Sequence, residues 1–282
     1  MEFGAHVSSS GGIDTAIDRI AAIGGDCVQV FTQSPRMWRT TEHPPDAIDR
    51  FRTKRRDVGI GGVVCHALYL VNLAGPDEAV YEKSIRAMQA TVEVASAIEA
   101  DAVVFHIGSH VGAGFEAGLE RARAALVQIL EHRRGDTWVC IENSAGAGAT
   151  MGRSLAEIEA LIDALDRHPR LGICLDSCHL WASGYDVTDR GIVDELAAEV
   201  DERIGLERLR ALHANDSAAE LGSNRDHHAN ILEGLMGEGL GAFLAHPAFQ
   251  RLGAYLEVPG VDKSGPNAAE IRKLRELHAR WV

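Results

Sequence analysis

Eight short apolar segments, rich in β-branched residues, recur along the chain, and most are followed by a longer stretch with helical periodicity. We expect strands at residues 3–7, 26–32, 62–67, 102–107, 137–142, 171–176, 208–214 and 252–257. Near-continuous apolar strands that alternate with helices are typical of a parallel sheet covered by helices. Eight such units predict an α/β fold, the closed (β/α)8 or TIM barrel, and we expect residues 1–282 to form a single domain.

Three of the intervening stretches carry clear helix signals. Residues 14–24 begin with Asp14 as a candidate N-cap and end at Gly24. Residues 77–100 are long enough for about six helical turns. Residues 115–135 end with basic residues and a glycine, as the C-termini of helices often do.

Bulk properties restrict the class of protein. There is no apolar run of about 18 residues, so we expect no membrane span. The N-terminal residues lack a basic segment followed by an apolar one, so we expect no signal peptide, a cytoplasmic protein and five cysteines present as thiols. The formal net charge of −13 argues against broad non-specific binding of nucleic acid, although bound divalent cations would reverse the sign of an acidic pocket.

Six of the eight expected strands carry, at their last position or one residue before it, a residue that can bind a metal ion. These residues are His66, His106, Glu142, Asp176, His213 and Glu257. In a TIM barrel the chemistry lies at the C-terminal ends of the strands, so the six side chains should meet at one end of the barrel. Polar residues also gather wherever strands meet loops, but the restriction of all six to His, Asp and Glu favours a metal centre. Nitrogen and oxygen ligands without thiolate suit zinc, manganese or iron.

A second candidate cluster lies in the long polar segment 213–234, which contains Asp226 and His228. On an extended stretch, a two-residue spacing puts both side chains on one side. An exposed polar loop is the simpler interpretation of this pair alone, but a loop of this length in a compact barrel is usually functional. An open zinc site needs a third protein ligand, and His179, in the loop after the sixth strand, is the natural candidate. Cys174 and Cys178 could be read as a zinc pair, but no second pair accompanies them, and we interpret them as core thiols.

The nine candidate ligands consist of five histidines and four carboxylates, which carry a charge of −4 when the histidines are neutral. Three divalent cations would bring the site to about +2, which attracts a phosphodiester. A site with several metal ions can activate water at neutral pH and stabilise the leaving oxygen of an in-line displacement.

Nine segments together resemble the endonuclease IV family, the zinc-dependent apurinic/apyrimidinic endonucleases of base-excision repair. They are GAHVS (4–8), FTQSPRMW (31–38), HALYLVNLA (66–74), FHIGSH (105–110), ENSAGAG (142–148), LDSCHLWASGYD (175–186), LHANDS (212–217), GSNRDHHANILEG (222–234) and LEVPGVDKSG (256–265). They occur in this order and cover essentially the whole chain.

The resemblance implies a TIM barrel that holds three zinc ions, with manganese or iron as alternatives at some sites. It implies one zinc at His66, His106 and Glu142, and a second at Asp176, His213 and Glu257, with Glu142 bridging the two. It implies a third zinc at His179, Asp226 and His228.

The resemblance also implies the reaction. A hydroxide held between metals would attack the phosphorus on the 5′ side of an abasic sugar and leave a 3′-hydroxyl and a 5′-deoxyribose phosphate. Glu142 is the implied catalytic residue, which orients or deprotonates the water. The implied partner is double-stranded DNA with abasic sites or blocked 3′ ends, which the enzyme would trim, and we expect a monomer.

Three residues match family positions that enter the DNA at the lesion: Arg36, Tyr69 and Leu70. An abasic site has lost the stacking of one base, so apolar or aromatic side chains can fill the gap. From the residues alone, packing within the loops is the simpler interpretation of Tyr69 and Leu70.

The chain departs from the family pattern at Ile107, Ala218, Leu232 and Val258, and none of these changes removes a candidate ligand. Leu232 stands where glycine is usual. Because leucine disfavours a positive φ, we expect the loop after His228 to be reshaped.

Two other classes of function fit parts of the sequence. A sugar isomerase or epimerase on the same barrel would need only Glu142, Asp176, His213 and Glu257, so the five other candidate ligands argue against it. A non-catalytic lesion-binding or metal-binding protein would be expected to have lost ligands, whereas this set is intact.

Overall fold

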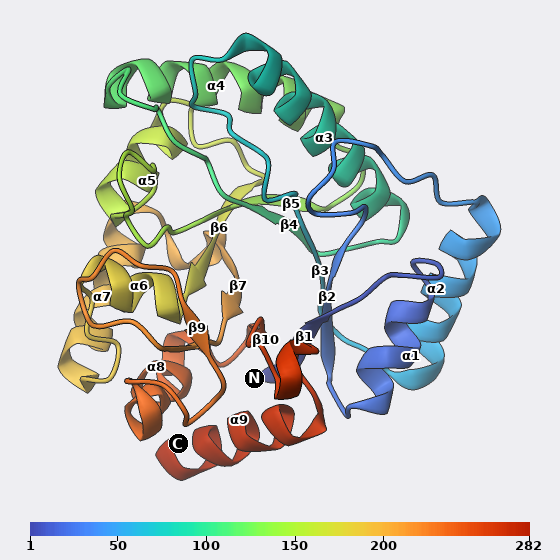
Figure 1. The fold of residues 1–282 in the computed structure, drawn as a ribbon, viewed down its shortest axis with the longest axis vertical. Coiled ribbons are helices and arrows are strands. Elements are labelled where there is room, and N and C mark those ends of the chain that lie inside the picture. Colours follow the sequence, from blue (N-terminus) through green and yellow to red (C-terminus); the bar gives the residue numbers. More distant parts are fainter.

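The computed structural model describes residues 1–282, and its eight parallel strands close into a barrel (Figure 1). The strands are β1 (Glu2–Val7), β2 (Cys27–Phe31), β3 (Val63–His66), β4 (Ala102–Phe105), β5 (Trp138–Glu142), β6 (Leu171–Asp176), β7 (Leu209–His213) and β10 (Gly253–Leu256). Each strand pairs with its neighbour in this series, and β10 closes the barrel against β1. The predicted TIM barrel is confirmed.

Helices surround the barrel on its outside (Figure 1). They are α1 (Thr15–Ala22), α2 (Pro45–Val58), α3 (Glu78–Ala97), α4 (Phe115–His132), α5 (Leu155–Asp163), α6 (Ser177–Ser183), α7 (Arg190–Arg203), α8 (Leu240–Ala245) and α9 (Ala268–Trp281). Short 3-10 helices lie at Leu206–Arg208, Gly237–Gly239, Pro247–Phe249 and Val261–Lys263. None of the helices combines the length and apolarity that crossing a membrane requires.

The alternation of side chains along each strand separates two apolar clusters. Outward-facing residues such as Val28 and Val30 pack with the helices in a cluster of 70 buried residues. The inward-facing residues form a smaller cluster of Cys27, Val64, Ala102, Val104, Cys140, Cys174, Ala211 and Tyr255. Because side chains on one face recur every two residues, the next inward position toward the C-terminal end of each strand forms a separate layer above this cluster.

Two local features differ from the sequence-based expectations. Asp14 has helical backbone angles and makes no capping hydrogen bond, so its predicted role as an N-cap is wrong. Its carboxylate instead accepts hydrogen bonds from Arg50 and Lys54 on α2, at 3.2 and 3.0 Å. Leu232 adopts a φ of 68°, and its side chain packs against the main core. The loop therefore keeps a left-handed residue at this position, and the packing offsets the strain.

A short hairpin was not predicted. It pairs β8 (Asp216–Ser217) with β9 (His228–Ala229) in antiparallel register. The carboxylate of Asp216, which is fully buried, accepts hydrogen bonds from the backbone N–H groups of Gly234 and Met236, both at 3.0 Å. The hairpin and this carboxylate fix the long loop after β7 across the end of the barrel.

Candidate metal centre

Every strand of the barrel contributes one polar side chain to the layer above the inner apolar cluster. The members are His6, Gln29, His66, His106, Glu142, Asp176, His213 and Glu257, each two residues beyond an inward-facing residue of its own strand. Glu142, Asp176 and His213 have no exposed surface. The six strand-end residues that the sequence singled out therefore do share one layer, at the C-terminal end of the barrel.

The first group consists of His66, His106 and Glu142, whose ligand atoms all lie within 4.8 Å of one another. Nε2 of His66 and Nε2 of His106 lie 3.1 and 3.4 Å from the same oxygen, Oε2 of Glu142. Two imidazole nitrogens that face one carboxylate oxygen leave room for a cation bound by all three.

The second group consists of Glu142, Asp176, His213 and Glu257, again with ligand atoms within 4.8 Å of one another. Nδ1 of His213 lies 2.9 Å from Oε1 of Glu142, 3.4 Å from Oε2 of Glu257 and 3.8 Å from Oδ2 of Asp176. Glu142 thus presents one oxygen to the first group and the other to the second.

The loop group consists of His179, Asp226 and His228. Nε2 of His179 lies 3.3 Å from Oδ2 of Asp226, and Nε2 of His228 lies 3.1 Å from Oδ1 of Asp226. His179 lies in the first turn of α6 and His228 on β9, whereas Asp226 lies in the loop and its side chain is 55% exposed. The pairing of β9 with β8 brings this loop to the barrel.

Charges within the groups are strongly coupled. Burial alone would raise the pKa of Glu142, but His106, His213 and His179 hold that pKa well below its ordinary value. Burial alone would lower the pKa of His228, but the nearby carboxylates of Asp226 and Asp176 raise it to about 9. Histidines and carboxylates that stabilise each other's charge in this way offer places where a cation can replace a proton.

In three of the histidines, the contact made by the second ring nitrogen supports the interpretation of these residues as metal ligands. Nδ1 of His66 donates a hydrogen bond to the carbonyl oxygen of Ala67 at 2.7 Å, and Nδ1 of His179 donates to the carbonyl oxygen of Asn143 at 3.0 Å. Nδ1 of His228 makes a longer contact, 3.4 Å, with the carbonyl oxygen of Glu257. Histidines that bind metal ions commonly donate their other N–H in this way.

In each of these histidines Nε2 is left to face the carboxylates. Nε2 of His228 is buried and makes no hydrogen bond with protein. A buried ring nitrogen that faces carboxylates without a hydrogen bond costs free energy, which a cation bound between these groups would offset. The donor set and its outer hydrogen bonds therefore fit bound divalent cations.

Two asparagines hold the carboxylate ligands in place. Asn215 donates from Nδ2 to Oδ2 of Asp176 at 2.7 Å and accepts at Oδ1 from the backbone N–H of Glu257 at 2.8 Å. Asn143 accepts from the backbone N–H of Asp176 at 2.7 Å. Because these contacts already orient the carboxylates, a cation can bind with little further loss of side-chain entropy.

The prediction of buried thiols agrees with the structure, in which all five cysteines are free and buried. Sγ of Cys178 nevertheless lies within 4.8 Å of ligand atoms of Asp176 and His228. Burial raises the pKa of the Cys178 thiol to about 12. Burial thus disfavours the thiolate, which is the form of cysteine that binds metal ions.

Two members of the polar layer, Gln29 and His6, were not among the candidate ligands. Both complete the polar layer on the two strands that carry no candidate ligand, β2 and β1. The signal that would have found Gln29 is the two-residue period, because Gln29 follows the inward-facing Cys27.

Of the three predicted DNA-contacting residues, Tyr69 lies beside the first group. Arg36 and Tyr69 are exposed and Leu70 is half-buried. The backbone N–H of Tyr69 donates to the carbonyl oxygen of Pro35 at 3.2 Å, which ties the loops after β2 and β3 together. The ring of Tyr69 lies 6.2 Å from the ring of His66, so this loop lies next to the metal centre.

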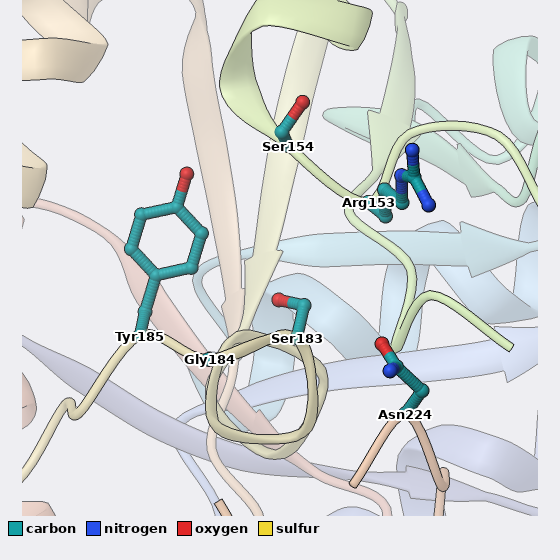
Figure 2. Close-up of a pocket in the computed structure, with 6 residues that line it drawn as sticks. All are labelled: Arg153, Ser154, Ser183, Gly184, Tyr185 and Asn224. Atoms are coloured by element: carbon teal, nitrogen blue, oxygen red, sulfur yellow. The ribbon is translucent and has the colours of Figure 1, made fainter. Parts of the chain in front are cut away.

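A cavity of about 440 Å³ lies beside the loop group and is lined by Arg153, Ser154, Ser183, Gly184, Tyr185 and Asn224 (Figure 2). Ser183 lies one helical turn after His179, and Asn224 lies two residues before Asp226. No sequence pattern had singled out this cavity. Nε of Arg153 donates to Glu157 at 2.9 Å, so the positive charge in the cavity is already partly paired.

Comparison with known proteins agrees with the geometry. Residues 17–280 match the family described as xylose isomerase-like TIM barrel. A probable endonuclease 4 from Methanoculleus marisnigri is 39% identical over 276 residues, which cover 97% of this chain and 98% of the relative. A probable endonuclease 4 from Natronomonas pharaonis is 38% identical over 280 residues, 99% of each chain.

Solved structures extend the likeness. The crystal structure of endonuclease IV from Thermus thermophilus superposes with a TM-score of 0.87 at 33% identity and covers 99% of this chain and all of that one. A D-tagatose 3-epimerase-like protein superposes with a TM-score of 0.72 at only 18% identity, which shows a shared fold alone. The chain therefore belongs to the endonuclease IV family of xylose isomerase-like TIM barrels.

Proposed function

We propose that this family member hydrolyses the phosphodiester on the 5′ side of an abasic site in double-stranded DNA. The products would be a 3′-hydroxyl and a 5′-deoxyribose phosphate, and the same site would trim blocked 3′ ends. The observation that carries the proposal is the convergence of nine His, Asp and Glu side chains into three groups at the C-terminal end of the barrel. Relatives named probable endonuclease 4, alike over almost the whole chain, support it.

Each group would hold one divalent cation, zinc in the first instance. The first group would bind through His66, His106 and Glu142, the second through Glu142, Asp176, His213 and Glu257, and the loop group through His179, Asp226 and His228. When bound, the cations would supply activation of water at neutral pH and stabilisation of the charge that develops on the leaving oxygen.

Glu142 occupies the central position. It belongs to both the first and the second group, and its Oε1 also lies 3.2 Å from Nδ1 of His179. Its lowered pKa keeps the carboxylate ionised, so it can accept a proton or a hydrogen bond from the attacking water. It is fully buried at the base of the centre, which holds its orientation fixed.

Arg36, Tyr69 and Leu70 would contact the DNA around the lesion. Tyr69 is 59% exposed although aromatic, and it lies next to the first group. An exposed aromatic side chain beside a catalytic centre can stack on the bases that flank a missing one. We further propose that the enzyme acts as a monomer, as one domain, in the cytoplasm where the nucleoid lies.

Incision of a labelled duplex that carries one abasic-site analogue tests the proposal. The zinc-loaded protein is expected to make a single nick immediately 5′ to the analogue and none in the matched intact duplex. Chelated protein serves as the second control and should not nick. No nick by protein shown to contain its cations would refute the proposal.

A further inference from the structure

We propose that Gln29 is a positioning residue of the second group. It fixes the imidazole of His213 with Nδ1 toward the carboxylates, while Glu257 holds the amide of Gln29 in place, and it so raises the affinity of this group for its cation. The inference rests on the proposed function in one respect, namely that the second group binds a cation.

Gln29 lies in the middle of β2 and has no exposed surface. Its side chain belongs to the polar layer, and it reaches across the interior of the barrel to His213, the last residue of β7, and to Glu257, which follows β10. Strands β1 and β10 separate β2 from β7 in the barrel, so these contacts do not arise from strand pairing. A fully buried amide must find partners for its donors and its acceptor, and Gln29 finds them in the polar layer, at His6, His213 and Glu257.

The orientation of the amide follows from its partners. Nε2 of Gln29 donates to Oε1 of Glu257 at 2.6 Å. A carboxylate can only accept, so the atom that faces Glu257 is the amide nitrogen. The amide oxygen therefore faces His213.

This orientation decides the tautomer of His213. Oε1 of Gln29 lies 2.8 Å from Nε2 of His213, and an amide oxygen can only accept, so Nε2 carries a hydrogen. In the neutral ring Nδ1 then has a free lone pair. That nitrogen is the one that faces Glu142, Asp176 and Glu257, so the hydrogen bond from Nε2 selects the nitrogen that would bind the cation.

The remaining hydrogen of the amide is also used. Nε2 of Gln29 lies 3.0 Å from Nδ1 of His6, on β1. With contacts to His6, Glu257 and His213, the amide cannot rotate without losing one of them. A side chain held at three points orients its neighbours at low entropic cost, which is how outer residues raise metal affinity.

Gln29 differs from the groups that orient three of the other histidines. His66, His179 and His228 contact backbone carbonyl oxygens through Nδ1, and no side-chain substitution removes a carbonyl. His213 depends on a side chain. A substitution of Gln29 therefore removes the hydrogen bond that orients His213 and leaves all nine candidate ligands unchanged.

The test is a competition between the protein and a zinc chelator, which reads cation affinity without reference to DNA. We would compare wild type with Gln29→Met, which keeps the length of the side chain and removes the amide. One cation per chain is expected to bind about 10–100-fold more weakly, while the others are unchanged. Val30→Ala, in the same strand but facing the helices, is the matched control and should leave every affinity unchanged.

A double-mutant cycle separates positioning from a general role in folding. If Gln29 acts through His213, then Gln29→Met should have little further effect in a His213→Ala background. A structural role would lower affinity by the same factor in both backgrounds and would lower the melting temperature of the chelated protein as well. Gln29→Asn, which keeps an amide but cannot reach both partners, provides the same comparison should the methionine variant not fold.

Three results would overturn the inference. They are equal zinc affinity of wild type and Gln29→Met, a loss that is additive with His213→Ala, or a loss spread over all cations. A wild-type protein that binds no cation would overturn the proposed function itself, so the two failures are distinguishable. Imidazole NMR of the zinc-loaded protein gives a further readout, because the hydrogen-bonded Nε2–H resonance of His213 should be present in wild type and lost in Gln29→Met.

Discussion

The second group and the loop group use the same residue types but are built differently. The four members of the second group lie at or directly after the ends of β5, β6, β7 and β10, and all but Glu257 have no exposed surface. The loop group takes one residue from α6, one from the long loop and one from the β8–β9 hairpin, and its Asp226 is largely exposed. The second group is therefore part of the barrel, whereas the loop group forms only when the long loop folds against the barrel.

This difference has an energetic consequence. Ligands on strand ends are held by the barrel whether or not a cation is present. The loop group relies on a two-residue hairpin and on Asp216, so cation binding there is coupled to ordering of the loop. We expect the barrel groups to govern the chemical step and the loop group to be the one that loses its cation first.

The largest effect is expected for Glu142→Gln, because Glu142 joins the first and second groups. The amide keeps the shape but cannot accept a proton, and turnover should fall by roughly 100–10,000-fold while binding of abasic duplex stays measurable. Glu270→Gln is the matched control, a buried glutamate on α9 outside the three groups, and should retain turnover within a few-fold. Near-normal turnover of Glu142→Gln would show that Glu142 does not act on the water.

His228→Ala tests the independence of the loop group. It should remove about one cation per chain, measured by elemental analysis, and leave the cations of the barrel groups. In wild type treated with chelator, the same cation should leave in the fast phase, because Asp226 is accessible. Unchanged metal content would contradict a cation at His179, Asp226 and His228, and loss of all cations would contradict the separation of the groups.

Tyr69→Ala tests whether loop residues act on binding rather than on chemistry. Loss of one stacking side chain should weaken binding to abasic duplex by about 5–100-fold, with a much smaller loss for intact duplex. Turnover at saturating DNA should change less than affinity does. Equal losses on both duplexes would exclude Tyr69 as a residue that recognises the lesion.

The smallest expected effect is on the stability of the metal-free protein as pH rises. The pKa of His228 is raised in the fold, from its ordinary 6.5 to about 9, by Asp226 and Asp176 against burial. A raised pKa gives stability that is fully present below pH 6.5 and lost as pH rises through 9. Chelated protein should therefore lose about 1–3 kcal/mol of unfolding free energy across this interval, and His228→Gln should lose less. Identical pH profiles for the two would contradict the coupling in the loop group.

The barrel and its six strand-end residues could be predicted because two simple periods combine. The two-residue alternation in each strand and the eightfold repeat of strand and helix together place His66 and Glu142 in one layer. The same alternation predicts Gln29, but glutamine is not a metal ligand, and its role appears only when its three partners are seen together.

The loop group was harder to predict from residues alone. The D-x-H spacing of Asp226 and His228 was visible in the sequence, but their approach to His179 depends on the hairpin with β8 and on the buried carboxylate of Asp216. Neither the hairpin nor the role of Asp216 has a strong local sequence pattern. A two-residue strand in particular is too short to show the alternation that identifies a strand. The conformation of Leu232 was missed for a related reason, since tertiary packing overrode its backbone preference.

Anomalous diffraction at the zinc absorption edge, from crystals of zinc-loaded protein, tests the central claim most directly. The account predicts three peaks: one among His66, His106 and Glu142, one among Glu142, Asp176, His213 and Glu257, and one among His179, Asp226 and His228. Peaks that avoid these residues, or their absence in protein shown to contain zinc, would contradict it.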